Sequence, residues 1–422
     1  MFALVRSFYH YCWSFFSAIN YGFPSRKLVV IGVTGTNGKS TVVWLLARIL
    51  EQAGYRVAAS SSIEFQIAEK KWTNAFKMTM PGRGYLQRLL RNAVQAKCTH
   101  AVIEVTSEGI RQHRHRFIHF AVSMFLNLSP EHIERHGSYA KYRRAKQNFF
   151  STGKMLVLNT GSLEAPYFLG DVNRKRVIGF RMSDQPVRVM LPEDSEELVA
   201  QDCIALPEGI AFTVSGLRAS APFSGRFNIE NALAAISAAV AVGVSVETAV
   251  SALKNIAATP GRFERILNAR GFTIIVDYAH TPTALQSVYE AAKAEASTLT
   301  CVLGAAGGGR DAWKRTELGK LAAQYCGHIF VADEDPYDEN PANIRAMVMD
   351  GARAASYGAH ITELADRREA IRKAILATPQ GGAVVITGKG SEPWMMWAKG
   401  EKRAWDDRQI VREELEKLET GH

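Results

Sequence analysis

The chain has 422 residues, 47% of them hydrophobic and 22% charged, a length and composition typical of a globular enzyme with two or three domains. Its five cysteines are scattered and contain no CxxC pair, so we expect neither a structural zinc site nor a disulfide framework, and a reducing cytoplasm is favoured. The net charge of +10 is uneven, because residues 1–160 hold 22 Lys and Arg against 7 Asp and Glu. This basic part suits an anionic ligand or membrane surface, and no helix-turn-helix, finger or RNP-like motif indicates a nucleic-acid partner.

Residues 1–25 form an aromatic, amphipathic segment with basic side chains at Arg6, Arg26 and Lys27 in or beside it. Its apolar run is too short and too polar to cross a bilayer, which needs roughly 20 apolar residues. It also lacks the small-residue cleavage site of a secretory signal. Two interpretations remain open: a helix that lies in a membrane interface, or a helix packed on the main domain.

From residue 26 onward, short apolar runs alternate with helical stretches, which predicts a parallel sheet wrapped by helices. A helix is predicted from Ser40 to Ala53, closed by Gly54. The segment 165–225 contains short runs such as "RKRVIGF" and "PVRVML" and predicts a small antiparallel insert. Strands are expected at 27–33, 99–105, 121–128 and 154–159.

A hinge is expected at "AATPGRFERI", where Pro260 and Gly261 interrupt the pattern. Beyond it, four predicted strands end in polar or glycine residues: "FTIIVDYA", "TLTCVLGAAG", "HIFVADED" and "AVVITGKG". Ligands bind at the carboxyl ends of strands in open parallel sheets, so this edge is a candidate functional edge. The predicted fold is α/β: an aromatic N-terminal segment (1–25), a central P-loop-type parallel-sheet ATPase domain with a small antiparallel insert (26–259), and a Rossmann-like α/β C-terminal domain (260–422).

The stretch "LVVIGVTGTNGKST" is a variant of the phosphate-binding loop, since a Walker A motif would place its first glycine at Val33. Its glycines let backbone N–H groups approach phosphate oxygens, and the following helix adds a partial positive charge. Lys39 can neutralise the β- and γ-phosphates, and Ser40 or Thr41 can reach a magnesium ion. The alternative is a glycine-rich turn without a ligand. The predicted ATP-binding residues of the loop are Gly35, Thr36, Asn37, Gly38, Lys39, Ser40 and Thr41.

Three later side chains are further candidates. Glu104, near the end of the predicted strand 99–105, can complete a magnesium site beside Ser40, although alone it would be a solvated strand-end charge. His132 lies in the polar stretch "SPEH", where a lone histidine is a weak metal candidate. Lys146 lies on a predicted helix and, taken alone, belongs to a solvated basic face.

Several motifs occur in order over nearly the whole chain. After the glycine loop come "IEVTSEGIRQHR", "NLSPEHIERHGSYAKYRRAK", "FSGRFNIENALAA", "GRFERI", "VDYAHTP", "DEDPYDENP" and "GKGSE". In this combination the chain resembles the Mur ligase family, closest to the muramyl-tripeptide synthetase branch that adds a diamino acid to a UDP-muramyl dipeptide.

The resemblance implies ATP-dependent amide formation in peptidoglycan precursor synthesis, through an acyl phosphate that an incoming amine then displaces. Lys39 would bind the phosphates, Ser40 and Glu104 would hold one magnesium ion, and His132 would ligate a second. Lys146 matches a lysine that the family uses in its N-carboxylated form. A carbamate supplies anionic oxygens to a cation, which an ammonium group does not.

The resemblance also implies contacts to the nucleotide and to both substrates. Asn231 resembles an adenine-contacting asparagine, and Arg262 an arginine that reaches the phosphates. Asp277 resembles the residue that holds the ribose, with His280 beside it. Glu392 in "GKGSE" resembles the carboxylate that meets the amine of the incoming amino acid. The positions that match contacts to the muramyl peptide are Thr79, Ser107, Gln112 and Arg114.

The chain departs from the branch in three places. Residues 1–25 stand where the branch has a UDP-gripping domain, so we expect UDP to be bound differently or the carrier to be another group, such as a lipid. Tyr337 stands at the diaminopimelate-selecting arginine and Asp335 at the asparagine before it. Tyrosine does not make a bidentate contact to a carboxylate, so the choice between L-lysine and diaminopimelate stays open. Ser391 replaces a histidine.

The leading hypothesis is therefore an ATP- and Mg²⁺-dependent peptide ligase acting on a muramyl peptide and an amino acid. The alternatives are a relative that extends another acidic acceptor (a lipid-linked muramyl peptide, a folate polyglutamate or a cyanophycin-type polymer) or an ATP-binding protein without ligase turnover. We expect a cytoplasmic monomer without a nucleic-acid partner, with peripheral membrane contact through residues 1–25 as an open question.

Overall fold

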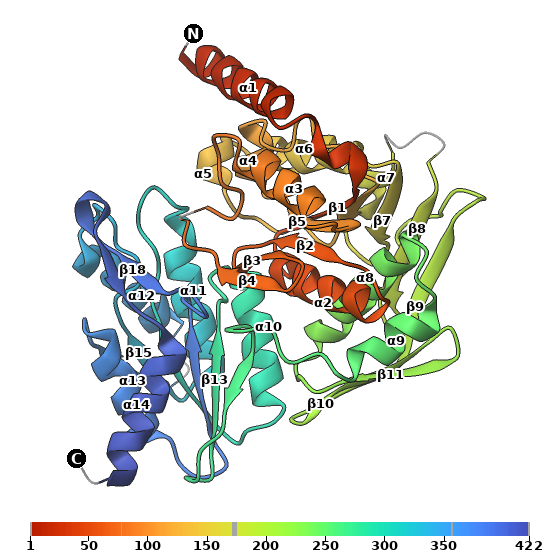
Figure 1. Cartoon of the computed structure of the whole chain (residues 1–422). Helices are drawn as coiled ribbons and strands as arrows, with labels where there is room; N and C mark the ends of the chain where they lie inside the picture. The colour runs from red at the N-terminus through yellow and green to blue at the C-terminus, as the bar shows by residue number, and fades with distance from the viewer. Residues whose placement is uncertain (1, 77, 171–174, 356–357, 421–422) are drawn as a thin grey trace. The chain divides into compact units, whose positions relative to one another are not determined.

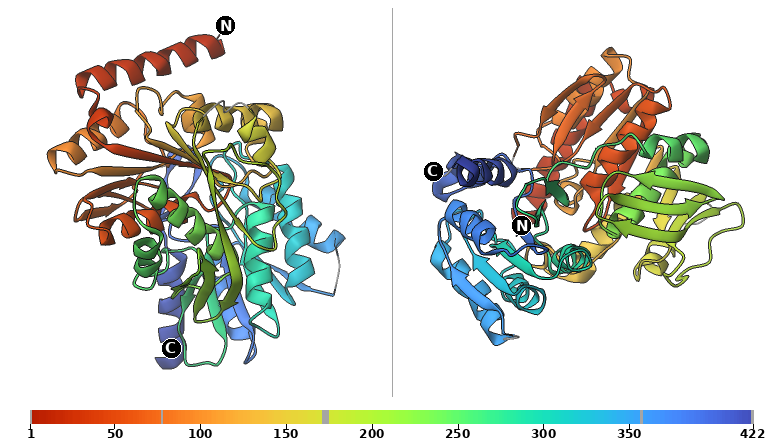
Figure 2. Two further views of the ribbon diagram at one scale, coloured as in Figure 1. Left: turned by 90° about the vertical axis from the view of Figure 1, so that its right-hand side faces the viewer. Right: turned by 90° about the horizontal axis from the view of Figure 1, so that it is seen from below.

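The computed structural model describes residues 2–76, 78–170, 175–355 and 358–420 (Figures 1 and 2). Its contacts divide the chain into two compact units, which are described one after the other. None of the described helices is long and apolar enough to cross a membrane. The first unit comprises Met1–Pro130, Ser138–Pro222 and Arg226–Ala257, and the second comprises Glu131–Gly137, Phe223–Gly225 and Ala258–His422.

The first unit is built on an 11-stranded sheet. Its strands, in sheet order, are β11 (Leu217–Ala221), β10 (Gly209–Val214), β9 (Glu196–Leu206), β8 (Val177–Met182), β7 (Met155–Asn159), β6 (Val122–Phe125), β1 (Val29–Thr34), β5 (His100–Glu104), β2 (Val57–Ser60), β3 (Glu64–Ile67) and β4 (Lys70–Thr73). Pairing is parallel from β2 to β9 and antiparallel at both edges. Parallel register pairs Val33 with Glu104, so the glycine loop and Glu104 emerge at the same edge of the sheet.

Helices cover both faces of this sheet. Figure 1 shows α3, α4 and α6 over one face and α2 and α8 over the other. On the first face, Leu90, Ile103 and Phe149 belong to one buried apolar cluster. The helices of the unit are α1 (Phe2–Asn20), α2 (Lys39–Gln52), α3 (Tyr85–Gln95), α4 (Ser107–Arg111), α6 (Tyr139–Phe150), α7 (Ala165–Leu169), α8 (Phe227–Ala241) and α9 (Val246–Leu253), with a 3-10 turn at η1 (Pro24–Lys27).

Helix α1 packs on the first unit through polar and aromatic side chains. Ser7 Oγ lies 2.8 Å from Nε2 of His113, and Ser14 Oγ donates to the His113 carbonyl oxygen at 2.9 Å. On the outer side, Phe8 is 69% exposed and Phe16 is 63% exposed. The inner side also makes apolar contacts, since the ring centres of Tyr11 and Phe15 lie 5.3 and 5.2 Å from that of Phe117. These contacts fit the interpretation of a helix packed on the main domain, although Phe8 and Phe16 stay exposed.

The second unit has a six-stranded sheet with antiparallel pairing only at β12. In sheet order its strands are β12 (Glu264–Ile266), β13 (Thr273–Asp277), β17 (Ala383–Thr387), β14 (Leu299–Leu303), β15 (His328–Val331) and β16 (His360–Glu363), and a separate hairpin joins β18 (Trp394–Met396) and β19 (Lys402–Ala404). Its helices are α5 (Ile133–His136), α10 (Pro282–Lys293), α11 (Trp313–Tyr325), α12 (Pro341–Ala354), α13 (Arg367–Ala377) and α14 (Asp407–Thr420), with η2 at Ala398–Gly400.

The parallel-dominated α/β architecture predicted from the sequence is confirmed in both sheets, but the insert is partly wrong. Strand β8 pairs in parallel with β7, and β9 pairs in parallel with β8. Only β9, β10 and β11 form the expected antiparallel meander. The run "PVRVML" (186–191) lies in no strand. The expectation of no disulfide framework needs one correction, because Cys301 of β14 and Cys326 after α11 form a disulfide.

Candidate active site

Two asparagines hold the glycine loop between β1 and α2. Gly38 adopts a left-handed φ of 82° before α2, and a Cβ on it would lie 2.3 Å from Oδ1 of Asn231, so a side chain does not fit there. Asn127 Oδ1 accepts hydrogen bonds from the backbone N–H groups of Thr36 (3.1 Å) and Asn37 (2.9 Å). The sequence analysis singled out Asn231 but missed Asn127. The signal for Asn127 was its place as a polar residue near the end of the predicted strand 121–128.

Ser40 and Glu104 are brought together at the start of α2. Ser40 Oγ donates to Glu104 Oε2 at 2.9 Å, and the backbone N–H of Ser62 donates to the same oxygen at 2.9 Å. Lys39 Nζ lies 3.9 Å from Glu104 Oε1 and donates to the Thr36 carbonyl oxygen at 2.9 Å. Glu104 is therefore part of the loop's charge arrangement and not a solvated strand-end charge.

A magnesium ion with nucleotide phosphates fits the chemistry of this pair. Mg²⁺ is usually bound through one or two carboxylates together with phosphate oxygens, and hydroxyl oxygens also suit it. Ser40 and Thr41 both lie buried in the first turn of α2. Among the residues that the structure describes, no group of three or more His, Cys, Asp and Glu side chains forms a metal cluster. The donors are thus Ser40 and Glu104, at the N-terminus of a helix that favours anions.

Lys146 of α6 lies beneath the glycine loop and is not on a solvated face. Its side chain is 2% exposed, and its Nζ donates to the carbonyl oxygen of Gly35 at 2.6 Å. Burial lowers the pKa of the Lys146 ammonium group well below its ordinary value; the positive charge of Lys39 lowers it further, and Glu104 opposes this. A lysine in this environment loses its proton readily and is then a nucleophilic amine.

Gln112 and Arg114 are brought together in the same unit. Arg114 donates to Oε1 of Gln112, to the carbonyl oxygen of Met80 and to Sδ of Met78. The half-buried Thr79 lies between these two methionines in the chain. Ser107 is buried at the start of α4, one residue after the N-cap Thr106. Three of the four predicted acceptor positions therefore meet around one segment, 78–80.

His132 belongs to the second unit, at the N-cap of α5. The backbone N–H groups of the two following residues, Ile133 and Glu134, each donate to the carboxylate of Asp311 at 3.0 Å. Ser40, Glu104 and Lys146 belong to the first unit. The predicted magnesium ligands are thus divided between the two units.

The predicted nucleotide residues of the second unit meet around residues 261–263 and the end of β13. The Arg262 guanidinium lies 4.1 Å from the ring centre of Tyr278, and His280 Nδ1 is 3.0 Å from the Tyr278 carbonyl oxygen. Asp277 accepts hydrogen bonds at 2.6 Å from the backbone N–H groups of Phe263 and Ala279. Burial raises the pKa of the Asp277 carboxyl, although Arg262 and these hydrogen bonds lower it. Asp277 therefore links Phe263 to the end of β13.

An ion-pair cluster forms at the carboxyl edge of the second sheet. The buried Lys389 Nζ lies 2.8 Å from Asp335 Oδ1 and 2.5 Å from Glu392 Oε2. Tyr278 donates through its hydroxyl to Glu392 Oε1 at 3.0 Å. A Cβ on Gly261 would lie 2.2 Å from the backbone nitrogen of Ser391, so the glycine allows the 388–392 loop to approach the hinge. Asp335, Ser391 and Glu392, all predicted substrate residues, therefore lie together.

Arg310 is a residue that the sequence analysis missed. Its guanidinium lies 5.8 Å from the ring centre of Tyr337, and its Nη2 lies 3.4 Å from the Tyr337 hydroxyl. Burial works to lower the pKa of Arg310, but Tyr337, Tyr278 and Glu392 raise it overall, so Arg310 stays a cation. Tyr337 itself is 8% exposed. The available signal was the glycine run "GAAGGGRD" after a predicted strand.

A glycine loop at the edge of a parallel sheet, with a hydroxyl, a carboxylate and a buried lysine around it, defines a nucleotide-dependent enzyme of the phosphate-loop class. Models of two family domains match this chain: the Mur ligase middle domain at residues 33–239, and the domain described as "Mur ligase, glutamate ligase domain" at residues 261–390. The chain belongs to the Mur ligase family, whose members are ATP-dependent ligases that form peptide bonds and are expected to use ATP and Mg²⁺.

Individual relatives agree with this assignment. The UDP-N-acetylmuramyl-tripeptide synthetase of Roseiflexus sp. is 32% identical over 96% of this chain and 82% of its own length. The UDP-N-acetylmuramoyl-L-alanyl-D-glutamate–2,6-diaminopimelate ligase of Corynebacterium efficiens is 34% identical over 94% of this chain and 75% of its own. A solved structure of an enzyme with that ligase name has a TM-score of 0.61 at 26% identity, covering 93% of this chain and 79% of its own. Folylpolyglutamate synthase of Mycobacterium tuberculosis shares the fold, with a TM-score of 0.70 at 15% identity over 89% of this chain and 91% of its own.

Proposed function

We propose that this protein is a muramyl-tripeptide synthetase: it uses ATP to join a diamino acid to the terminal carboxylate of a muramyl dipeptide. The relatives at 32% and 34% identity carry names of this type. The observation that supports the proposal most is Lys146, a buried lysine with a lowered pKa whose amine lies 2.6 Å from the carbonyl oxygen of the phosphate loop residue Gly35.

The reaction has two steps. An oxygen of the acceptor carboxylate attacks the γ-phosphorus of ATP, the bond from that phosphorus to the β-phosphate oxygen breaks, and ADP leaves. The amine of the amino acid then attacks the acyl carbon, the bond from carbon to the phosphate oxygen breaks, and inorganic phosphate leaves with loss of a proton from nitrogen. Lys39 and the loop N–H groups neutralise the phosphates, because two anions must otherwise be brought together. Mg²⁺, held by Ser40 and Glu104, would supply further positive charge there.

Lys146 acts in this proposal as a carbamate. Its neutral amine adds to the carbon of CO₂ and loses a proton, which turns a cationic side chain into an anionic one. The lowered pKa supports this because only the unprotonated amine reacts. By the family resemblance, the carbamate would serve as a magnesium ligand, and so would His132.

The ion-pair cluster of the second unit binds the incoming amino acid in this proposal. Glu392 meets the amine, and Arg310 supplies a guanidinium for a carboxylate in place of the arginine that Tyr337 lacks. A bidentate guanidinium–carboxylate contact is the usual way to select a carboxylate. Lys389 and Asp335 hold Glu392 in position through the ion pairs at 2.8 and 2.5 Å. Both L-lysine and diaminopimelate carry the amine and the carboxylate that this arrangement recognises.

The division of labour follows the proposed domains. Residues 26–259 bind ATP through the glycine loop and Asn231. The same domain binds the acceptor through Thr79, Ser107, Gln112 and Arg114. Residues 260–422 bind the amino acid, and Arg262, Asp277 and His280 of this domain contact the nucleotide. We expect the enzyme to act as a monomer in the cytoplasm, where ATP and the amino acid are supplied.

A screen of acceptors against amino acids tests this function. UDP-linked muramyl dipeptide, a lipid-linked muramyl dipeptide, a folate polyglutamate and an aspartate polymer are each combined with L-lysine or diaminopimelate, and phosphate release is measured with mass spectrometry of the product. We expect a muramyl tripeptide from one of the first two acceptors. Turnover only with the folate or the polymer, or ATP hydrolysis without any amide product, would contradict the proposal.

We also propose that the outer face of α1 makes peripheral contact with an anionic membrane surface. Val5, Phe8, Phe16 and Ile19 are all at least 50% exposed and share one side of the helix at 3.6-residue spacing. Exposed Arg6, Arg26 and Lys27 give the charge that complements anionic lipids.

Co-sedimentation with vesicles of phosphatidylglycerol and phosphatidylcholine tests this contact. We expect the full chain to bind, and Phe8→Ser/Phe16→Ser to lose at least about tenfold in partition, since two aromatic side chains leave the interface. The control Leu163→Ser/Leu267→Ser removes exposed apolar side chains elsewhere. Equal vesicle binding by both double variants would contradict the membrane assignment. Dimers that form with rising protein concentration, without vesicle binding, would also contradict it.

A further inference from the structure

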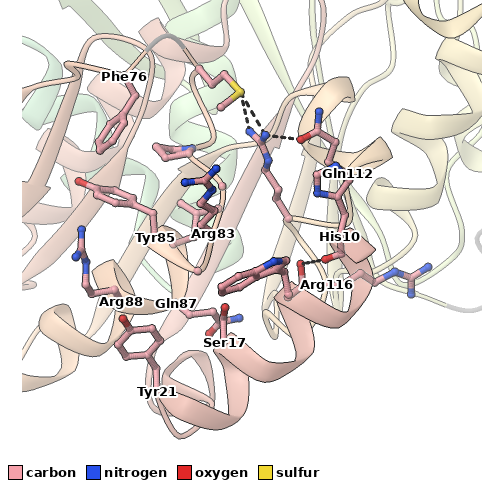
Figure 3. A pocket seen from close by; sticks show the side chains of 18 of the residues that line it. His10, Ser17, Tyr21, Phe76, Arg83, Tyr85, Gln87, Arg88, Gln112 and Arg116 are labelled. Carbon is pink, nitrogen blue, oxygen red and sulfur yellow. Dashed lines mark hydrogen bonds between the residues drawn. The ribbon is translucent and has the colours of Figure 1, made fainter. Parts of the chain in front are cut away.

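A cavity of about 560 Å³ lies between α1 and the rest of the first unit. Its walls come from three places: the inner side of α1, Phe76 together with the segment 78–88 up to the first turn of α3, and the loop after α4. Figure 3 shows Phe76, Tyr85 and Arg88 along one side and His10 and Gln112 along the other, with Arg83 between them. The size is that of a small-molecule site. Helix α1 lies outside the residues 33–239 and 261–390 that match the two Mur ligase domain models.

The cavity is lined by positive charge. Arg83, Arg88, Arg114 and Arg116 are among its lining residues, and none of the described lining residues is Asp or Glu. Guanidinium groups attract phosphate and hold it by paired hydrogen bonds, and Glu108 compensates part of the charge of Arg114 alone among these four. The lining therefore favours a ligand with at least one phosphate group.

Aromatic rings make up much of the remaining wall. Phe76 and Tyr85 meet edge to face with ring centres 4.7 Å apart, and Tyr9 and Trp13 of α1 do so at 6.3 Å. Tyr21 completes the α1 side. Such rings stack on the faces of sugars and bases or contact the first units of a lipid chain. The cavity thus combines arginines that can bind phosphate with aromatic rings that can stack on the attached group.

Two buried polar atoms of the cavity residues have no hydrogen-bond partner. Gln87 is 4% exposed, and its Oε1 is unpartnered. Nε2 of His10 is also unpartnered. A buried polar atom without a partner is unfavourable, so hydrogen-bonding capacity beside the cavity is unused in this structure.

The cavity also adjoins the proposed acceptor site. Gln112 and Arg114, which match muramyl-peptide contacts, are both among its lining residues. Ser17 of α1 approaches the opposite wall so closely that a Cβ on Gly84 would lie 2.5 Å from its Oγ. Helix α1 therefore closes the cavity next to the acceptor-binding segment.

We propose that this cavity binds the diphosphate-linked end of the acceptor, that is, the carrier to which the muramyl peptide is attached. This rests on the proposed function for the identity of the acceptor. The diphosphate is bound by Arg83 and Arg88, while the aromatic walls take the group on its far side. That chemistry is common to a nucleoside diphosphate and to a polyprenyl diphosphate.

A charge-removing double variant tests the site, with a closely matched control. Arg83→Asn/Arg88→Gln removes two guanidiniums; asparagine suits the left-handed φ of 53° at position 83. The control variant Lys97→Asn/Arg91→Gln removes two cations outside the cavity. Lys97 also has a left-handed φ, 59°, and Arg91 lies on helix α3 like Arg88. Calorimetry on the full chain measures binding of UDP-linked muramyl dipeptide, of a short-chain polyprenyl-diphosphate-linked muramyl dipeptide and of free muramyl dipeptide.

We expect the cavity variant to bind the diphosphate-linked acceptor about tenfold or more weakly than the wild type. Its affinities for free muramyl dipeptide and for ATP should not change, and the control variant should bind all ligands like the wild type. The linked acceptor that shows this loss identifies the carrier as nucleotide or lipid. Equal affinities for the cavity variant and the control, or an equal loss with free muramyl dipeptide, would overturn the site. Trp13→Ala gives a second test through the aromatic wall. Binding is measured without turnover, so failure of the ligase reaction is recognised separately in the acceptor screen.

Discussion

Replacing Lys146 by methionine removes the amine but keeps an unbranched side chain of similar length in a buried position. The proposed carbamate then cannot form. We expect kcat to fall by at least about 10²-fold, the size of losing one electrostatic group of an active site. The KM for the acceptor should change little, because Lys146 contacts the phosphate loop and not the residues that match the acceptor. Added bicarbonate should stimulate the wild-type enzyme in CO₂-depleted buffer and leave Lys146→Met unchanged.

The lowered pKa also predicts a pH-dependent stability difference. In the unfolded chain Lys146 keeps its proton up to about pH 10.4, whereas in the folded protein without CO₂ it loses the proton at lower pH. Between these two pKa values the unfolded state binds more protons, so the free energy of unfolding rises with pH. The slope from one group is at most about 1.4 kcal/mol per pH unit. The methionine variant lacks this contribution.

Thermal unfolding in CO₂-free buffers from about pH 7 to about pH 10 measures this difference. We expect the Tm of the wild type, relative to Lys146→Met, to increase with pH across this window. Parallel Tm curves would show that Lys146 titrates as an ordinary lysine. Full ligase activity of the methionine variant would refute the carbamate role outright.

Two further predictions concern the metal pair and the amino-acid site. Glu104→Gln keeps the shape of the side chain but removes the carboxylate charge next to Ser40, so the Mg²⁺ concentration for half-maximal activity should rise by about 10- to 100-fold. A titration of activity with Mg²⁺ measures this midpoint. An unchanged midpoint would show that Glu104 is not a magnesium ligand. Arg310→Lys keeps the positive charge but loses the planar guanidinium group, so the KM for the amino acid should rise by about tenfold with the KM for ATP unchanged. Steady-state kinetics with L-lysine and with diaminopimelate measure both constants. An equal rise in the KM for ATP would indicate a structural role for Arg310.

Much of the central fold could be predicted because its signals are local. The predicted strands at 27–33, 99–105 and 154–159 and the helix from Ser40 correspond to β1, β5, β7 and α2 within a few residues, since apolar runs and glycine boundaries act over short distances. The strand at 121–128 is shorter than expected, Val122–Phe125. Short strands such as β2, β3 and β16 gave no comparable pattern and were not predicted.

Which strands pair depends on contacts between residues far apart in the chain, and the predictions of strand pairing in the insert were partly wrong. The run at 186–191 has strand-like composition but finds no partner strand. Strand β8 joins the parallel sheet beside β7, because it is α7, and not a tight turn, that connects them. The disulfide between Cys301 and Cys326 is of the same kind: 25 residues separate the two cysteines, and only the placement of α11 brings them together.

By itself the sequence determined the phosphate-loop character of "GVTGTNGKST", the α/β class and the family resemblance, because spacing and residue type are written in the chain. Only the tertiary structure decided that Lys146 is buried against Gly35 and that Asn127 holds the loop. It also decided that Arg310 lies beside Tyr337, that Phe8 and Phe16 of α1 are exposed, and that α1 forms one wall of a basic cavity. Burial, pKa and cavity shape depend on which distant segments share space, and a linear pattern does not carry that information.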